Sequence, residues 1–242
     1  MALPLVADPV AVRQTEGLVH GFLTLSTLDG KRLADGELLQ TGEGEEVTSR
    51  LVFHFRDGSL SDETTVYSQR EHFRMLRNHL IRKGPAFPMP LEAWIDGTTG
   101  AVKVSYVDDG KTKTEEETME LPADLANGLI LTMLKNVVPT APETVLSFVA
   151  LTPKPRLVHL EVTPTGEQPF QVGETQRKAM RYRVKVRIGG ITGVMAKLVG
   201  KQPPDSSVWV LTGDHPAFVK SESPFYEGGD LWRIELTSPE WR

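Results

Sequence analysis

The sequence contains no cysteine, which excludes disulfides, thiol nucleophiles, cysteine-ligated zinc and iron–sulfur clusters. It also has no run of about 18 consecutive apolar residues, so no segment is expected to cross a bilayer as a helix. Aromatic residues make up only 7% of the chain, and the formal net charge of −5 argues against a surface built for phosphate backbones. We therefore expect neither a membrane-spanning helix nor a nucleic-acid partner.

Motifs of known catalytic and metal-binding proteins are also missing. The chain has no GxSxG, HExxH, EF-hand or P-loop pattern. No two of its histidines have the i, i+2 or i, i+4 spacing of a chelating pair; they are His20, His54, His72, His79, His159 and His215. We therefore predict no metal, no cofactor and no catalytic residue. A hydrolase stays an alternative, because a triad assembled from distant segments leaves no local motif.

The length of 242 residues and the hydrophobic fraction of 39% suit one globular domain over residues 1–242, with an extended N-terminal segment over 1–14. Met1 to Val12 lack the basic and continuously apolar regions of a signal peptide. A processed exported protein behind a start methionine and the natural start of a cytosolic protein both fit this pattern.

Antiparallel strands are predicted by closely spaced turn dipeptides between alternating segments. These dipeptides are Asp29-Gly30, Asp35-Gly36, Asp57-Gly58, Asp96-Gly97, Asp109-Gly110 and Gly189-Gly190. Apolar and polar residues alternate between Thr48 and Ser68, and late strands are expected around Tyr182, Val194, Val208 and Ile234. Residues 70–83 fit either a helix or a strand with a bulge, and the surrounding hairpins favour the strand.

One helix is expected at about 122–137, between the two sets of hairpins. Pro122 suits a first helical position, and apolar residues follow at four-residue spacing up to Pro139. Lys135 is the only charged residue between Leu125 and Val138, so the helix should be buried. The predicted fold is therefore mainly β: a strongly curved antiparallel sheet, an incomplete barrel, wrapped around one apolar helix.

Side chains on this helix and on one strand are the candidate lining of an interior that would hold a lipid or acyl chain. They are Leu125, Leu129, Met133, Met180 and Tyr182.

The strand Arg177 to Ile188 divides its side chains most clearly. Met180, Tyr182, Val184, Val186 and Ile188 project to one face, because successive side chains in a strand point to opposite sides. The other face carries Arg181, Arg183, Lys185 and Arg187. This cationic strip is the candidate contact for an anionic headgroup or an acidic partner, although a solvated face kept from aggregating by basic residues gives the same pattern.

Several runs of the sequence resemble an uncharacterised family of exported bacterial proteins, and the resemblance covers nearly the whole chain. The runs include GLVHGFLTLSTLDGKRLADGELLQ, RLVFHFRDGSLSDETTVYSQR, LPADLANGLILTMLKN and VWVLTGDHPAFVKSES. More distantly, the order of hairpins, one apolar helix and further strands resembles periplasmic lipoprotein carriers and related half-barrel proteins. The resemblance implies a periplasmic or secreted protein with a hydrophobic cavity under its helix, and it assigns no catalytic residue.

These observations lead to three functional hypotheses. The first is a non-enzymatic exported protein that binds or carries an apolar ligand inside a half-barrel. The second is an envelope scaffold that binds a protein partner through the cationic strip or exposed strand edges. The third is the hydrolase with a dispersed site, which requires a histidine and a carboxylate together in a cleft.

Overall fold

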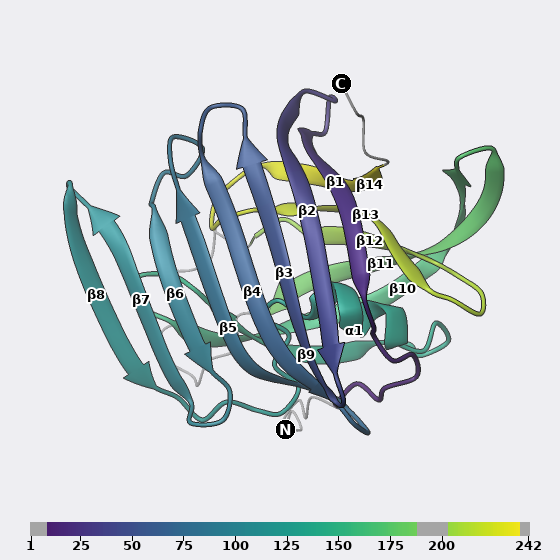
Figure 1. The fold of residues 1–242 in the computed structure, drawn as a ribbon, viewed down its shortest axis with the longest axis horizontal. Coiled ribbons are helices and arrows are strands. Elements are labelled where there is room, and N and C mark those ends of the chain that lie inside the picture. Colours follow the sequence, from purple (N-terminus) through teal and green to yellow (C-terminus); the bar gives the residue numbers. More distant parts are fainter. Residues whose placement is uncertain (1–8, 188–202, 238–242) are drawn as a thin grey trace.

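A computed structural model describes residues 9–187 and 203–237, which form an antiparallel β fold with one short helix (Figure 1). Fourteen strands and the helix occur in this part of the chain. They are β1 (Val19–Thr27), β2 (Arg32–Glu43), β3 (Glu46–Phe55), β4 (Leu60–Gln69), β5 (Phe73–Lys83), β6 (Leu91–Asp96), β7 (Ala101–Asp108), β8 (Lys111–Thr118), α1 (Ile130–Asn136), β9 (Thr144–Ala150), β10 (Arg156–Val172), β11 (Thr175–Arg187), β12 (Ser206–Leu211), β13 (Ala217–Pro224) and β14 (Leu231–Thr237).

All strands belong to one sheet, ordered β8-β7-β6-β5-β4-β3-β2-β1-β14-β13-β12-β11-β10-β9. Each half is a meander, and the halves join where β1 pairs with β14. Within the described residues the sheet does not close, because β8 and β9 remain at its two edges. Figure 1 shows β1–β8 as a front wall and β9–β14 behind it, with α1 between the walls. This arrangement confirms the predicted incomplete barrel around a helix.

The turn dipeptides were informative wherever the chain needs a tight reversal. Asp109 and Gly110 both have positive φ, 50° and 72°, as a two-residue type I′ turn requires, and they join β7 to β8. Asp35-Gly36 was wrong as a turn, because both residues lie inside β2. Gly36 leaves room for the Phe53 ring instead, since a Cβ there would lie 2.4 Å from a ring carbon. The predicted Gly189-Gly190 turn and the strand around Val194 lie outside the described residues.

Residues 73–83 form the predicted bulged strand. The β4–β5 register shifts between Val66 and Tyr67, whose partners are Arg77 and Met75, so Leu76 is the extra residue. The bulge changes which positions face the interior: Phe73 and Met75 before it, and Asn78 and Leu80 after it, are buried. A regular alternation across the whole strand would have placed Asn78 outside.

The predicted helix at 122–137 is too long, since α1 begins only at Ile130. Gly128 has a φ of +65°, which is outside the helical region and ends any helix that approaches it from Pro122. Residues 124–127 lie along the edge of β9 instead. Ala126 N donates to Ser147 O, and Asp124 and Asn127 side chains hydrogen-bond the backbone of Ser147 and Val149 at 2.8–2.9 Å. This segment therefore covers the β9 edge.

Two apolar clusters fill the space between the walls. The larger surrounds α1 and joins residues of β5–β7 to residues of β9–β12. The smaller is largely aromatic, with Phe53, Phe55 and Phe87 packed against Phe225 and Trp232. Burial of apolar surface at about 25 cal/mol per Å² makes these clusters the main stabilising element of the fold.

The N-terminal segment runs across one end of the barrel. Its described part pairs with the chain just before β5 through the Ala11–His72 bridge, and residues 1–8 of the predicted extended segment lie outside the described residues. Glu16 forms an ion pair with Lys135 of α1, with Oε1 and Nζ 2.5 Å apart. Asn136 Oδ1 accepts hydrogen bonds from the backbone N–H groups of Arg13 and Gln14. The segment is therefore attached to the helix by polar contacts.

Candidate functional site

The five side chains expected to line the interior lie in one cluster around α1. Each is at most 9% exposed, and they pack with side chains from both walls; they are Leu125, Leu129, Met133, Met180 and Tyr182. The Tyr182 hydroxyl donates to the carbonyl of Val137 at 3.5 Å, and burial raises the pKa of the phenol. The structure therefore brings the predicted set together as mutually packed side chains.

Polar side chains also face the interior, and the sequence did not indicate them. Asn78 is 2% exposed and donates to Glu63 and Thr65, each at 2.9 Å. Arg82 lies over the Phe225 ring, with 5.4 Å between its guanidinium carbon and the ring centroid, and burial lowers its pKa.

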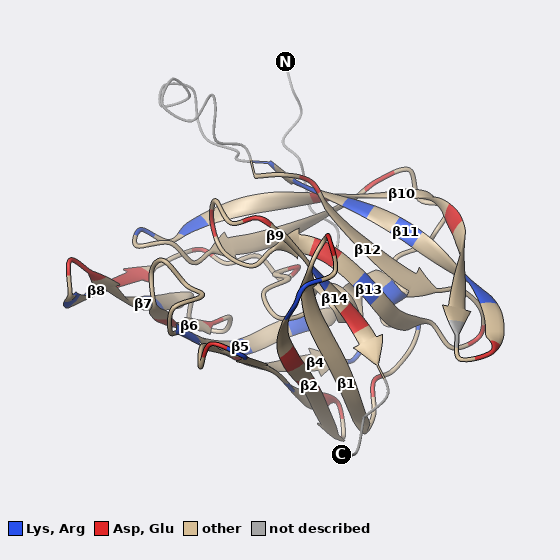
Figure 2. Cartoon of the chain, turned by 90° about the horizontal axis from the view of Figure 1, so that it is seen from above, with Lys and Arg blue, Asp and Glu red and all other residues tan. Residues whose placement is uncertain are grey.

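The cationic strip occupies the outer face of β11, as its alternation with buried residues predicted. Figure 2 marks the basic residues along this strand in blue. Arg181 Nη2 donates to Ser207 Oγ at 2.9 Å, and its guanidinium carbon lies 5.2 Å from the Trp209 ring centroid. Arg187 forms an ion pair with Glu161, which raises the pKa of the guanidinium. The other two members of the strip, Arg183 and Lys185, have no ion-pair partner among the described residues.

Trp209 anchors the strip on the neighbouring strand. Its indole Nε1 donates to Gln168 Oε1 at 2.8 Å, and Lys220 Nζ lies 3.8 Å from the ring centroid. Trp209 is 6% exposed and belongs to a small apolar cluster on the outer side of the sheet. Arg181 is therefore held against a buried ring, which fixes the backbone that carries Arg183.

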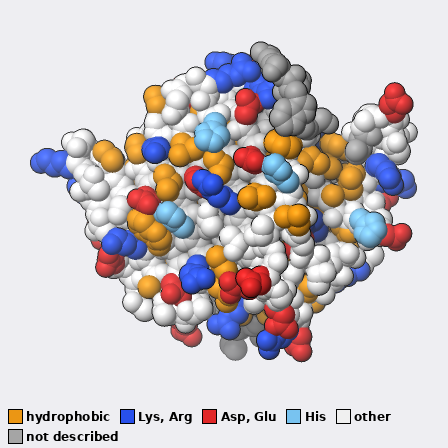
Figure 3. Space-filling model, in the orientation of Figure 1, with side chains coloured by type: hydrophobic (Ala, Val, Ile, Leu, Met, Phe, Trp, Pro, Cys, Tyr) orange, Lys and Arg blue, Asp and Glu red, His pale blue; other side chains and the backbone are white. Residues whose placement is uncertain are grey.

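A shallow hollow of about 650 Å³ lies on the opposite wall, across the outer face of β4–β8. Figure 3 shows this face with hydrophobic, histidine and charged side chains interspersed. A row of directly paired residues crosses the hollow, one from each strand: Thr64, His79, Trp94, Lys103 and Glu116. Sequence reasoning missed this row because its members come from five separate strands.

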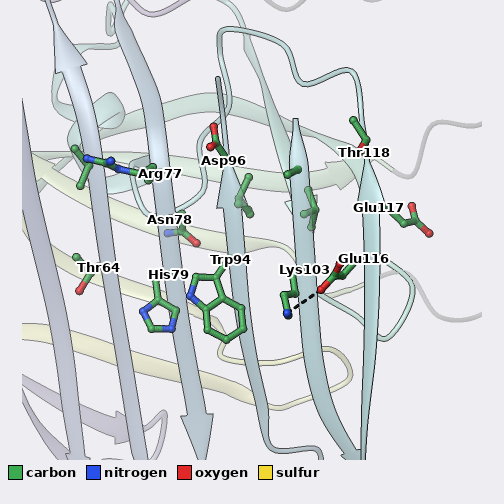
Figure 4. Close-up of a pocket in the computed structure, with 14 residues that line it drawn as sticks. Thr64, Arg77, Asn78, His79, Trp94, Asp96, Lys103, Glu116, Glu117 and Thr118 are labelled. Carbon is green, nitrogen blue, oxygen red and sulfur yellow. Dashed lines mark ion pairs between the residues drawn. The ribbon is translucent and has the colours of Figure 1, made fainter. Parts of the chain in front are cut away.

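Most side chains of the row already contact a neighbour within the row (Figure 4). The His79 and Trp94 rings stack with centroids 4.8 Å apart, and Lys103 Nζ lies 5.9 Å from the indole centroid. Lys103 also forms an ion pair with Glu116 at 2.7 Å, drawn as a dashed line in Figure 4. Such cross-strand pairs stabilise a sheet, so the row reinforces β5–β8 up to the edge.

Histidine and carboxylate do meet at this hollow, as the hydrolase hypothesis requires. His79 Nε2 hydrogen-bonds Glu92 Oε1 at 2.9 Å. Thr64 is the cross-strand neighbour of His79, but no hydroxyl hydrogen-bonds the imidazole among the described residues. A second pair, His20 and Glu37, lies at 2.6 Å on the exposed surface of β1 and β2. In the described part of the chain, no three or more His, Asp or Glu residues converge as a metal site would require.

The fold defines an open, barrel-like antiparallel β protein, and the comparisons with known proteins agree with this class. Among solved structures, the chain is similar to a β-barrel-like protein of the domain of unknown function DUF1849 from Brucella abortus. The TM-score is 0.51 at 10% sequence identity, over 95% of this chain and 100% of that chain. No family model and no curated protein matches the sequence. No helix in the described residues is long and apolar enough to span a membrane.

Proposed function

We propose that the chain is a non-enzymatic, exported interaction module that binds an acidic protein surface through the cationic strip of β11. One observation carries the proposal: Arg183 and Lys185 lie on the outer face without an ion-pair partner among the described residues. The exported setting is supported by the resemblance of the sequence to exported bacterial proteins.

The geometry of the strip supports binding of an opposite charge. Arg181 and Arg187 at its two ends are held by Trp209, Ser207 and Glu161, so the strand between them is fixed. Two free cations on a fixed strand offer an acidic partner a preorganised contact, which reduces the entropy lost on binding. Charged surfaces of this kind mainly increase association rates and confer salt dependence.

Reversing both free charges tests this proposal. We expect the double variant R183E/K185E to bind immobilised poly-L-glutamate about tenfold more weakly than the unmodified protein, because two attractions become repulsions. The matched control K31E/K154E changes the net charge equally at two exposed lysines elsewhere, and it should retain binding. Retention is measured over a salt series.

Three outcomes would contradict the proposal. One is equal weakening in both variants, which would assign the effect to net charge. Another is no binding by the unmodified protein at low salt. The third is binding to anionic phospholipid vesicles but not to poly-L-glutamate, which would assign the strip to lipid headgroups.

Carriage of an apolar ligand in the interior stays a prediction. It requires space between the two walls rather than a charged outer surface. A lipid between the walls would have to displace side chains such as Leu129 and Met133, which are fully buried. Native mass spectrometry of freshly purified protein, beside a denatured sample, tests it. We expect the mass of the chain alone, because the described side chains around α1 pack against one another; a bound acyl species lost on unfolding would favour the carrier.

A further inference from the structure

We propose that the free edge of β8 pairs antiparallel with β8 of a second copy of this chain, around a two-fold axis at Thr114. This interface lies on the opposite wall from the cationic strip and does not depend on it. The resulting dimer would continue the sheet from one subunit into the next.

The two edges of the sheet differ in a way that exposes β8. Residues 124–127 cover the β9 edge with backbone and side-chain hydrogen bonds. Among the described strands β8 pairs only with β7, and its residues are almost all exposed. Figure 1 shows β8 as the outermost strand of the front wall. An open edge presents a row of unpaired N–H and C=O groups, which is a template for another strand.

The hairpin geometry identifies which backbone groups are free. Asp108 and Lys111 flank a two-residue turn and therefore form a hydrogen-bonded pair. At the other end of the ladder Met119 N donates to Gly100 O at 2.9 Å, so residue 119, also odd-numbered, directs its backbone groups to the same side as Lys111. Odd-numbered residues of β8 thus direct their backbone groups to β7, and the even-numbered ones direct theirs outward. The outward set is Thr112, Thr114, Glu116 and Thr118.

Two β8 strands can pair only in alignments that place even-numbered residues opposite even-numbered residues, and the charges of the strand favour one of these alignments. With Thr114 opposite its own copy, Lys111 lies opposite Glu117 of the second copy and Lys113 opposite Glu115 of the second copy. The two-fold axis repeats both pairs, so four opposite-charge pairs form. Shifting the axis to residue 115 sets glutamate against glutamate, and shifting it to 113 sets lysine against lysine. Like charges directly opposite each other destabilise a sheet.

The four charged positions also share one face of the sheet, beside the inward residues Val102, Val104 and Tyr106. Thr114 meets Thr114 of the second copy on the other face, a favourable cross-strand pair. Glu116 keeps its ion pair with Lys103 on that face. Within one copy Lys113 pairs with Asp108 at 2.5 Å, but both side chains are about half exposed, so this contact opposes dimerisation weakly.

Charges on an edge strand commonly prevent pairing between copies. The order of the charges along β8 shows whether they repel a second copy or complement it. A strand of one sign repels its own copy in every register. Here cations occupy the beginning of the strand and acids its end, so the antiparallel copy is complementary. An isologous contact of this type closes as a dimer and does not extend into a fibre.

Sedimentation velocity over a concentration series up to about 1 mM tests the interface. We expect the unmodified protein to dimerise at low salt and to dissociate at high salt. The variants K111E/K113E and E115K/E117K should each be monomeric, because each carries a single sign at the four facing positions 111, 113, 115 and 117; Glu116, on the other face, is unchanged. An equal mixture of the two variants should form a heterodimer. The substituted positions are exposed except Glu117, which is half-buried, and circular dichroism checks that each variant is folded.

The fourfold variant K111E/K113E/E115K/E117K restores complementarity in the same register, so it should dimerise alone. T114P removes an outward N–H and should block pairing without affecting the β7–β8 ladder. A monomer at every concentration of the unmodified protein overturns the proposal. So does a dimer that survives K111E/K113E, or a mixture of the two double variants that stays monomeric.

Discussion

Replacement of Gly128 by alanine is expected to destabilise the fold by about 2–5 kcal/mol, the larger of the two strongest single-site effects we predict. Gly128 has a φ of +65°, where a Cβ costs about 1–2 kcal/mol in an L-residue. The added Cβ would also lie 1.9 Å from Thr65 Oγ1 and 2.8 Å from Asn78 Nδ2. Both side chains are buried and hydrogen-bonded to each other, so neither can move freely.

Gly58→Ala provides the matched control. Its φ is +85°, but nothing lies within 4 Å of the position of an added Cβ. We therefore expect the backbone cost alone, about 1–2 kcal/mol. In the double variant G128A/T65A the closest contact is removed, and part of the loss should be recovered. Urea denaturation measures all three free energies of unfolding. Equal costs at Gly128 and Gly58 would show that the close approach to β4 and β5 is not a constraint.

The hairpins were predictable because the signals that form them are local. Alternation along one strand and a turn dipeptide at its end depend on a few adjacent residues. The same pattern at Asp35-Gly36 failed because the reason for that glycine is the Phe53 ring on the next strand. The helix boundary failed for a similar reason. Residues 124–127 satisfy the edge of β9, more than twenty residues along the chain, and that contact leaves only the part from Ile130 for the helix.

The same difference between local signals and contacts with distant segments applies to the candidate site residues. The alternation of β11 indicated the cationic strip, because every member lies on one strand. It gave no sign that Glu161 and Trp209, on the two flanking strands, would engage the ends of the strip. The row from Thr64 to Glu116 and the interior position of Asn78 depend on strand register, and the bulge at Leu76 shifts that register by one residue. A single sequence does not reveal such a shift.

Lys135→Met is the second large effect, with an expected loss of about 3 kcal/mol. Lys135 and Glu16 side chains are 17% and 7% exposed, and their charged atoms lie 2.5 Å apart. Methionine preserves the length and helix propensity of lysine but removes the charge. Glu16 would then remain buried with Gln40 Nε2, at 2.9 Å, as its hydrogen-bond donor. An ionised carboxylate that loses its counter-ion inside a protein is strongly destabilising.

The variant K135M/E16Q separates the charge from the packing. Glutamine retains a carbonyl for Gln40 and carries no charge, so most of the lost stability should return. Hydrogen exchange gives a second measurement: residues 9–18 should exchange faster in K135M than in the unmodified protein, because this ion pair attaches the segment to α1. K103M, which removes the exposed ion pair with Glu116, should change stability by less than about 1 kcal/mol. If K135M cost no more than K103M, or if E16Q failed to restore it, the pair would contribute only as a surface contact, and the N-terminal segment would be attached by its backbone hydrogen bonds to β5 and Asn136.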